Sequence, residues 1–188
     1  DVNKGWLQKI REDAPDHVMG STTTGGETTP GAVKVGKGGE YANLDAVVMD
    51  AVNELIDVVY QDDDDLVVIC GRELLSDKYF PLVNKEQENS EKLAADMIIS
   101  QKRMGGLQAV RAPFFPPNAL LITRLDNLSI YWQEDTRRRS VIDNPKRDRI
   151  ENFESVNEAY VVEDYRCAAL VENIQIGDFS AAAAEAGA

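Results

Sequence analysis

The clearest apolar pattern in this chain lies between residues 43 and 80. Residues 66–70 read Leu-Val-Val-Ile-Cys, five consecutive apolar residues between the four aspartates at 62–65 and Gly71. A run of this length bounded by charge and glycine is typical of a strand that is buried on both faces. We therefore expect residues 66–70 to lie in the middle of a sheet.

Helices are predicted on both sides of this strand. Residues 43–60 carry apolar side chains at helical spacing, and Asn43 is suited to be the N-cap residue. A second short helix is predicted after Gly71 and should end at Pro81, because proline disrupts a helix interior. The predicted helix, strand and helix form the unit on which the rest of the chain packs.

The first forty residues predict a short helix followed by a loosely paired hairpin. Residues 5–12 place Trp6, Leu7 and Ile10 on one helical face that needs a packing partner. Residues 19–39 are rich in Gly and Thr, and Gly25-Gly26 is the predicted tip of the hairpin. Residues 36–39 (Gly-Lys-Gly-Gly) lack the spacing of a phosphate-binding Walker loop, so we do not assign one there.

The pattern changes beyond residue 84. A polar connection at 84–89 precedes a helix that is capped by Ser90, runs through Ile98 and ends near Gly105-Gly106, and residues 107–111 predict a strand. The prolines at 113, 116 and 117 then predict a stiff connector, which we interpret as the boundary between two lobes. Beyond it, apolar and polar residues alternate, which is typical of antiparallel strands with one wet face. These stretches are 119–125, 127–133, 160–162 and 166–177, and the tail 181–188 is expected to be disordered.

Composition narrows the classes of function. The 188 residues hold 20 Lys plus Arg and 33 Asp plus Glu, a net charge of −13, which argues against a protein whose main task is to bind nucleic acid. No apolar run approaches the roughly 18 to 20 residues of a membrane span, and no secretion signal is recognisable at the amino terminus. The chain starts at Asp1 rather than at methionine, so we expect it to be a fragment or a processed piece.

One basic cluster stands out against this acidic background. Within thirteen residues the chain carries six cationic side chains: Arg137, Arg138, Arg139, Lys146, Arg147 and Arg149. They can form a solvated turn with local ion pairs to Glu134, Asp135, Asp143 and Asp148, since such exposed pairs are common and weak. They can instead be intersubunit contacts that meet acidic surface on a neighbour. DNA binding is a third reading of the same residues.

No group of residues predicts a reaction, and we assign no catalytic, cofactor-binding or metal-ligating residue. His17 is the single histidine and lies beside the Gly/Thr-rich segment, where a catalytic geometry is hard to maintain. Cys70 and Cys167 fall in predicted core strands and are best explained as buried thiols. The aspartates at 62–65 fit a solvated turn before the strand, although a loose divalent-cation site there stays open.

Short sequence stretches, in the same order as in one known protein family, give the chain a specific resemblance to that family from its first residue to about Ser180. It resembles the carboxyl-terminal part of the major capsid protein of P-two-type temperate tailed bacteriophages, whose precursor is roughly twice as long. The stretches that carry this resemblance are 5–9 (GWLQK), 35–39 (VGKGG), 65–69 (DLVVI), 77–81 (DKYFP), 83–87 (VNKEQ), 98–103 (IISQKR), 127–131 (NLSIY) and 160–165 (YVVEDY).

The resemblance implies an α+β class and the HK-ninety-seven type of coat fold. In that fold an axial lobe, with helices around a small central sheet, points to the centre of each pentamer or hexamer. A peripheral lobe contributes antiparallel strands. The implied division is a lead-in helix and flexible hairpin or loop at 1–42, the axial lobe at 43–117, the peripheral lobe at 118–180 and the tail at 181–188. The family's amino-terminal arm, extended loop and most of its spine helix have no counterpart here.

By the same resemblance the function is structural. The protein would be a non-enzymatic subunit of an icosahedral phage head, located in the virion and in the host cytoplasm during assembly. Its partners would be copies of itself, an internal scaffold protein and packaged double-stranded DNA, with no membrane and no cofactor. Without arm, loop and spine helix, the isolated chain is expected to be a monomer or weak oligomer.

Two functions from other classes stay open. One is an intracellular α/β enzyme or ligand-binding domain with its site near Gly71, which a deep pocket with converging polar groups would favour. The other is a nucleic-acid contact module at residues 137–149, which steeply salt-dependent DNA binding would favour.

Overall fold

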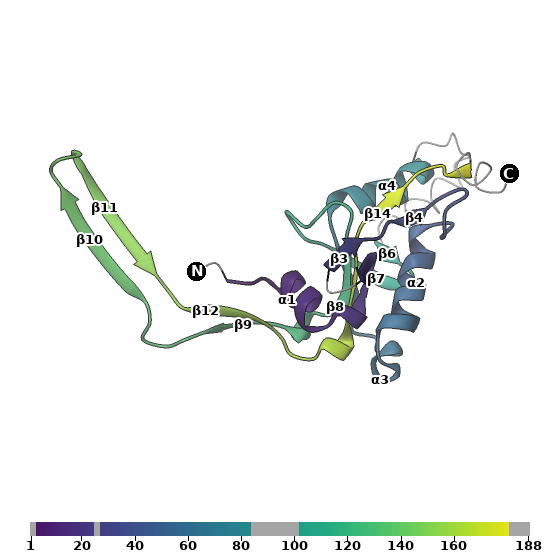
Figure 1. Ribbon diagram of the computed structural model, residues 1–188, viewed down its shortest axis with the longest axis horizontal. Coiled ribbons are helices and arrows are strands. Elements are labelled where there is room, and N and C mark those ends of the chain that lie inside the picture. The colour runs from purple at the N-terminus through teal and green to yellow at the C-terminus, as the bar shows by residue number, and fades with distance from the viewer. Residues whose placement is uncertain (1–2, 25–26, 84–101, 181–188) are drawn as a thin grey trace.

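A six-stranded sheet lies at the centre of the computed structural model, which describes residues 3–24, 27–83 and 102–180. β5 lies between two other strands, which confirms the prediction that residues 66–70 form a strand in the middle of a sheet. Its neighbours β8 and β7 pair with it antiparallel and parallel, respectively (Figure 1). In spatial order the sheet contains β1 (Val18–Met19), β13 (Ala168–Val171), β8 (Leu120–Arg124), β5 (Leu66–Cys70), β7 (Leu107–Arg111) and β6 (Arg103–Met104).

Apolar layers cover both faces of this sheet. Along β5, Leu66, Val68 and Cys70 belong to one buried cluster, while Val67 and Ile69 belong to a second cluster on the opposite face. Because successive strand residues point to opposite faces, β5, β8 and β13 each contribute to both clusters. The prediction of one wet face is therefore wrong for β8 and β13, since central strands covered on both sides have no solvent face.

The first cluster is closed by two helices. α2 (Leu44–Leu55) is capped as predicted, because the Asn43 side chain accepts a hydrogen bond from the Ala46 amide at 2.9 Å. The prediction that one helix extends to residue 60 is wrong. Ile56 is extended and turns its side chain into the core, and Asp57 caps a separate short helix, α3 (Val58–Gln61), by accepting a hydrogen bond from the Val59 amide.

The second helix on this face is α4 (Arg72–Val83). It contributes Leu74, Leu75 and Tyr79 to the first cluster, as predicted. It includes Pro81, so the prediction that Pro81 ends the helix is wrong. Pro81 lacks a backbone donor, and the two residues that follow it nevertheless keep helical geometry.

The second cluster is closed by α1 (Trp6–Asp13), which confirms the predicted amino-terminal helix. Its Ile10 is fully buried against this cluster. After the short 3₁₀ turn η1 (Pro15–His17), β2 (Ser21–Thr24) and β3 (Glu27–Pro30) form the predicted hairpin, whose tip at 25–26 lies outside the described residues. β4 (Val33–Val35) then pairs in parallel with β14 (Ile174–Ile176).

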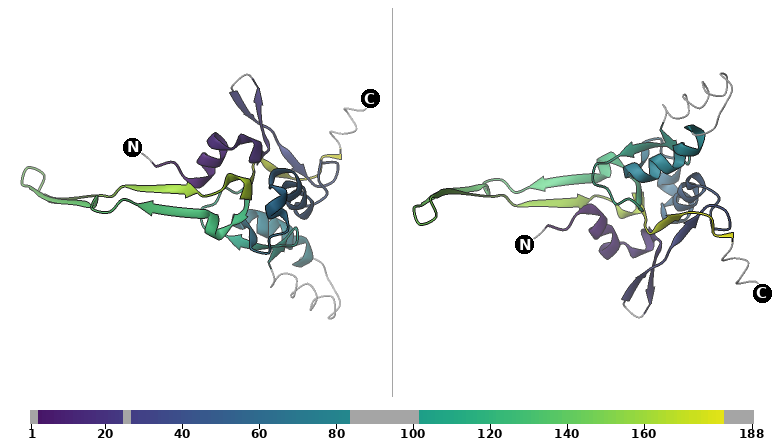
Figure 2. Two further views of the ribbon diagram at one scale, coloured as in Figure 1. Left: turned by 90° about the horizontal axis from the view of Figure 1, so that it is seen from below. Right: turned by 90° about the horizontal axis from the view of Figure 1, so that it is seen from above.

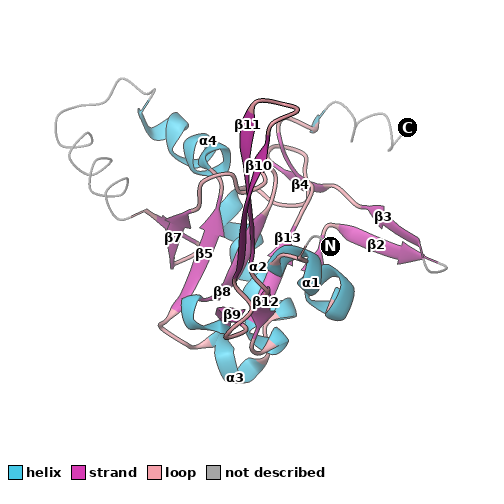
Figure 3. Ribbon diagram, turned by 90° about the vertical axis from the view of Figure 1, so that its left-hand side faces the viewer, coloured by secondary structure: helices cyan, strands magenta, loops and turns pink. Residues whose placement is uncertain are grey.

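An arm extends from this body (Figure 1). Its inner part pairs β9 (Leu128–Trp132) with β12 (Glu158–Val162), and its outer part pairs β10 (Arg138–Asn144) with β11 (Arg149–Ser155). The 3₁₀ turns η2 (Leu125–Asn127) and η3 (Tyr165–Cys167) join the arm to the body. Figure 2 shows the arm and the β2–β3 hairpin projecting in different directions, and Figure 3 views the molecule along the arm with α1 beside it.

The proline-rich connector at 113–117 is the predicted boundary between two lobes. Residue 117 does not separate two sheets, because β8 follows it and pairs along its whole length with β5. The assignment of 43–117 and 118–180 to axial and peripheral lobes stays a prediction. The predicted tail at 181–188 and the predicted helix up to residue 101 lie outside the described residues. The predicted end of that helix near Gly105 is wrong, because Arg103–Met104 form β6 and pair with β7.

Candidate functional site

The basic cluster lies on the outer part of the arm. Arg138 and Arg139 begin β10, Arg149 begins β11, and Lys146 and Arg147 belong to the turn that joins these strands. A solvated turn is one of the three readings of this region given above, and the two strands are not predicted there. A usable signal was present, because the β-branched residues Val141-Ile142 and Ile150 flank the turn sequence Asn144-Pro145.

Two of the six cations are neutralised within the arm. Arg137 donates from Nε to Glu154 at 2.8 Å, and Arg149 donates from Nε to Glu151 at 2.8 Å. The expected partners Glu134, Asp135, Asp143 and Asp148 form no ion pair with any described residue. Within the described residues, four exposed cations also form none, which leaves them available to a partner: Arg138, Arg139, Lys146 and Arg147.

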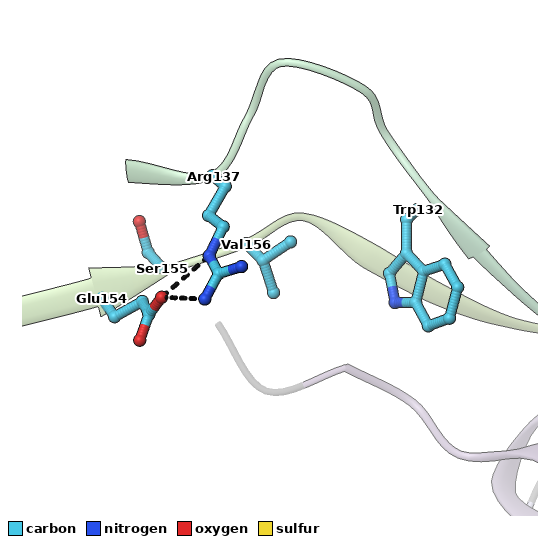
Figure 4. Close-up of a pocket in the computed structure, with 5 residues that line it drawn as sticks. All are labelled: Trp132, Arg137, Glu154, Ser155 and Val156. Carbon is cyan, nitrogen blue, oxygen red and sulfur yellow. Dashed lines mark hydrogen bonds and ion pairs between the residues drawn. The ribbon is translucent and has the colours of Figure 1, made fainter. Parts of the chain in front are cut away.

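Large apolar side chains accompany these charges. Trp132 at the end of β9 is 67 % exposed, Val141 is 60 % exposed and Ile150 is 73 % exposed. A depression of about 300 Å³ lies between Trp132, Val156 and the Arg137–Glu154 ion pair (Figure 4). This combination of exposed apolar area and unpaired positive charge is suited to binding a macromolecule.

A buried polar junction fixes the root of the arm. The Asn127 side chain donates to the Asp164 carbonyl at 2.8 Å and to Thr123 Oγ1 at 3.1 Å, and it accepts from the Asp164 amide at 2.7 Å. The Asn127 carbonyl also accepts from the Glu163 amide at 3.0 Å. One side chain thus joins β8 and the strand end of β12, so it sets where the arm leaves the sheet.

Electrostatics strengthens the same junction. A hydrogen bond from Arg166, together with one from Tyr60, lowers the pKa of Asp164 to about 2. Arg124, the last residue of β8, donates a hydrogen bond to Asp63 at 3.0 Å and forms an ion pair with Asp126. Asp164 therefore stays ionised at neutral pH and holds Arg166 and Tyr60 together.

A second contact steadies the arm from the side. Trp6 of α1 donates from its indole nitrogen to the Ser129 carbonyl at 3.2 Å. Its ring meets Tyr160 edge to face with a centroid separation of 5.1 Å. The inner arm is thereby packed on the body. Among the described helices and strands, none outside the arm packs to a comparable extent on β10 or β11.

Residues with possible chemical roles have packing roles here. Cys70 and Cys167 are free and buried, although Cys167 lies in η3 rather than in a strand. His17 contacts the Leu55 carbonyl through Nδ1 at 2.5 Å. Asp63, from the acidic run, accepts from the Asp65 amide and binds Arg124. In the described part of the chain, no group of three or more His, Cys, Asp or Glu side chains is arranged to hold a metal ion.

Close packing also explains the glycines at positions 36 and 71, where the sequence analysis considered a phosphate loop and a ligand site. A Cβ on Gly36 would lie 2.0 Å from the Gly177 carbonyl oxygen, so the carboxyl-terminal segment occupies the space next to this loop. A Cβ on Gly71 would lie 3.2 Å from the Phe115 carbonyl oxygen. Depressions of about 250 and 260 Å³ flank Arg72 and Arg111 near Gly71, but neither presents a nucleophile paired with a base among the described residues. None of the helices in the described ranges is sufficiently long and apolar to cross a bilayer.

Comparisons with known proteins agree with this arrangement. The chain is 62 % identical over 192 residues to the "Capsid proteins" of Escherichia phage P2, an alignment that covers all of this chain and 54 % of that protein. It is 37 % identical over 177 residues to the "Major capsid protein" of Serratia phage KSP20, covering 93 % of this chain and 50 % of that protein. The chain thus spans about half the length of the curated relatives it matches.

A solved structure shows the same fold. In the satellite phage P4 procapsid including size determination (Sid) protein, one chain superposes with a TM-score of 0.83 at 58 % sequence identity, covering 96 % of this chain and 53 % of that chain. This match confirms the predicted α+β class and coat-protein fold. The family described as "Phage major capsid protein, P2 family" matches residues 1–174. The chain therefore belongs to the P2 family of phage major capsid proteins.

Proposed function

We propose that this chain acts as a structural subunit of a phage head. In the complete coat protein, copies would associate into pentamers and hexamers and close into an icosahedral shell around double-stranded DNA, with an internal scaffold protein assisting assembly. The single observation that carries this proposal is the 62 % identity to a phage coat protein over the whole chain. The proposed role is non-enzymatic, because a shell subunit acts through the free energy of many repeated contacts and needs no reactive group.

The net charge of −13 supports this role, since an acidic lining repels packaged DNA and leaves it mobile while the head fills. We further propose that residues 43–117 and 118–180 correspond to axial and peripheral lobes that share the central sheet. The isolated chain should be a monomer or weak oligomer. Sedimentation of the isolated chain tests this point, and shell-sized particles would contradict it.

We also propose that the basic cluster makes intersubunit contacts. Arg138, Arg139, Lys146 and Arg147 supply the attraction, because Arg137 and Arg149 are already paired within the arm. A positively charged arm end is attracted to the acidic surface of a neighbouring copy, and exposed charges of this kind mainly orient and accelerate association.

The experiment compares two double variants of the complete coat protein. Arg138→Ala with Arg139→Ala should lower the yield of shells in electron micrographs and the salt concentration at which they dissociate. Arg137→Ala with Arg149→Ala removes the same net charge from cations that already have partners, so it is the matched control. Equal yields and equal salt tolerance for both double variants and the unaltered protein would refute the assignment of these arginines.

A further inference from the structure

The run of four aspartates at 62–65 lies close to the root of the arm. Asp63 is partly buried, whereas the other three aspartates are exposed. Asp63 Oδ1 accepts a hydrogen bond from the Asp65 amide at 3.0 Å, and Asp63 Oδ2 accepts one from Arg124 Nη1 at 3.0 Å. The first bond is a local turn typical of aspartate, and it holds the carboxylate in the orientation that faces Arg124.

Arg124 links this turn to the point where the chain enters the arm. It is the last residue of β8, and its Nε and Nη2 atoms donate to the Asp126 carboxylate in η2 at 3.0 and 2.5 Å. The side chains of Arg124 and Asp63 are 30 % and 22 % exposed, so salt screens this ion pair less than a pair at the open surface. The entry to the arm is therefore bound to the turn that precedes β5.

The residues just before this turn hold the exit from the arm. The Tyr60 hydroxyl donates to Asp164 Oδ2 at 2.9 Å, and the Asp57 amide donates to the Arg166 carbonyl at 3.1 Å. The Arg166 guanidinium lies 6.0 Å from the centroid of the Tyr60 ring, at the limit of a cation–π contact. Residues 57–65, which we call the α3 segment, thus contact both connections between the arm and the body.

The α3 segment is itself fixed to the body. Figure 1 shows α3 at the end of α2, and Gln61 Nε2 donates to the Ile56 carbonyl at 2.8 Å and to the Asn53 carbonyl at 3.0 Å. Tyr60 borders the first apolar cluster, whereas Trp6, which bonds the inner arm, borders the second cluster on the opposite face of the sheet. The arm is therefore held from the sides of both faces.

We infer that the α3 segment is a positioning element that sets the angle between the arm and the central sheet, through Asp63 at the entry and Tyr60 at the exit. A single contact would let the arm turn about it, whereas contacts to two separate connections oppose that rotation. The inference concerns contacts within one chain. Its consequence for shells rests on the proposed function, because a closed assembly requires a fixed rotation between copies.

The test measures distances between spin labels on the body and on the inner arm. Met49→Cys on α2 and Trp132→Cys at the end of β9 carry the labels, since the native side chains are 58 % and 67 % exposed. Cys70 and Cys167 are buried, so the labels attach selectively. The complete coat protein is measured unassembled and diluted with unlabelled protein, and circular dichroism establishes that each variant is folded.

Two single variants each remove one contact of the α3 segment. Asp63→Asn keeps the bond to the Asp65 amide and removes the charge that faces Arg124, and Tyr60→Phe keeps the ring and removes the bond to Asp164. Each should widen the distance distribution by at least about 1.5-fold, because local contacts limit local motion. Tyr60→Phe changes one exposed-edge hydroxyl only, so it decides the question even where Asp63→Asn does not fold.

The matched controls make the same chemical changes where they do not join arm and body. Asp64→Asn removes a charge from the exposed neighbour of Asp63. Tyr131→Phe removes a hydroxyl that donates to Glu163 at 2.9 Å at an exposed site. Both controls should leave the distance distribution unchanged. Equal widths in the test variants and the controls would overturn the inference and leave the proposed function intact.

A second measurement concerns the shells. Asp63→Asn combined with Tyr60→Phe should give at least about threefold more open or irregular particles in electron micrographs than Asp64→Asn combined with Tyr131→Phe, since rings close only at a fixed rotation. Equally regular shells from both double variants would contradict a positioning role in assembly. An unaltered complete coat protein that forms no shells would overturn the proposed function, while the distance measurement would still decide the role of the α3 segment.

Discussion

Replacing Asn127 by alanine should destabilise the protein far more than an ordinary surface change. Asn127 is 6 % exposed, and its amide makes three hydrogen bonds that join β8 to the end of β12. The alanine variant leaves the Asp164 amide, the Asp164 carbonyl and Thr123 Oγ1 without this partner. An unsatisfied buried polar group costs roughly 1–3 kcal/mol.

The expected loss follows from how well water can replace each bond. Thr123 is fully buried, whereas Asp164 is partly exposed, so water can reach part of the Asp164 backbone. We therefore expect the free energy of unfolding to fall by about 2–4 kcal/mol, less than the sum of three full penalties. Asn157→Ala is the matched control, because its side chain bonds Gln133 at an exposed site, and its loss should stay below about 0.5 kcal/mol.

Urea unfolding of both variants, followed by circular dichroism, measures these losses directly. A second readout addresses the arm itself. Spin labels at Glu40 and Ile150 should show a broader distance distribution in Asn127→Ala, since the arm then loses its fixed root. A loss below about 0.5 kcal/mol, or an unchanged distance distribution, would refute the role given to Asn127.

Three further predictions concern acid stability, a tight turn and thiol reactivity. Arg166 lowers the pKa of Asp164 to about 2 from 3.8, so this carboxylate contributes stability above pH 3.8 that is lost as the pH falls toward 2. Asp164→Asn should flatten the dependence of unfolding free energy on pH across that window, and an unchanged slope would contradict this. Gly105 has a φ of +58° and a Cβ there would lie 2.5 Å from an α2 side chain, so Gly105→Ala should cost about 3 kcal/mol. Gly106→Ala, with a φ of +86° but open space, should cost only about 1–2 kcal/mol, and thermal melts of the two variants would reveal equal costs if the clash were unimportant. Burial raises the pKa of the Cys70 thiol to about 11, so it should react with a disulfide reagent at pH 8 only after unfolding, and rapid labelling of folded protein would disprove this.

The central elements could be predicted from the sequence because their signals are local. The run at 66–70 is apolar without interruption, which predicts the buried strand β5. Asn43 precedes an amphipathic stretch, which predicts its role as the N-cap of α2. The break at Ile56 could not be predicted in this way. It depends on a tertiary pocket that accepts the Ile56 side chain and on a backbone bond from the Asp57 amide to the Arg166 carbonyl, which lies far away in the sequence.

The arm shows the opposite limitation. Residues 138–144 and 149–155 pair with each other and are exposed along nearly their whole length, so neither strand shows the apolar alternation that marks a half-buried strand. The signal that remains is the β-branched residues on either side of the turn sequence Asn144-Pro145. The six basic residues were identified, but their grouping was not. The folded arm pairs Arg137 with Glu154 and Arg149 with Glu151, which distinguishes these two cations from the four that form no ion pair with a described residue.

The contrast between the basic arm end and the acidic remainder of the chain also bears on the symmetry of the proposed contacts between copies. Residues 137–149 hold six Lys or Arg and two Asp, a net charge of +4, so two arm ends repel each other and a twofold contact between them is disfavoured. Contact between an arm end and the acidic remainder of another copy joins two different surfaces, which is a heterologous interface. Interfaces of this kind generate rings when the rotation between copies closes. An arm that is basic, partly apolar and fixed at its root by Asn127 would therefore direct copies toward rings, because attraction selects the surface and the buried junction limits the angle.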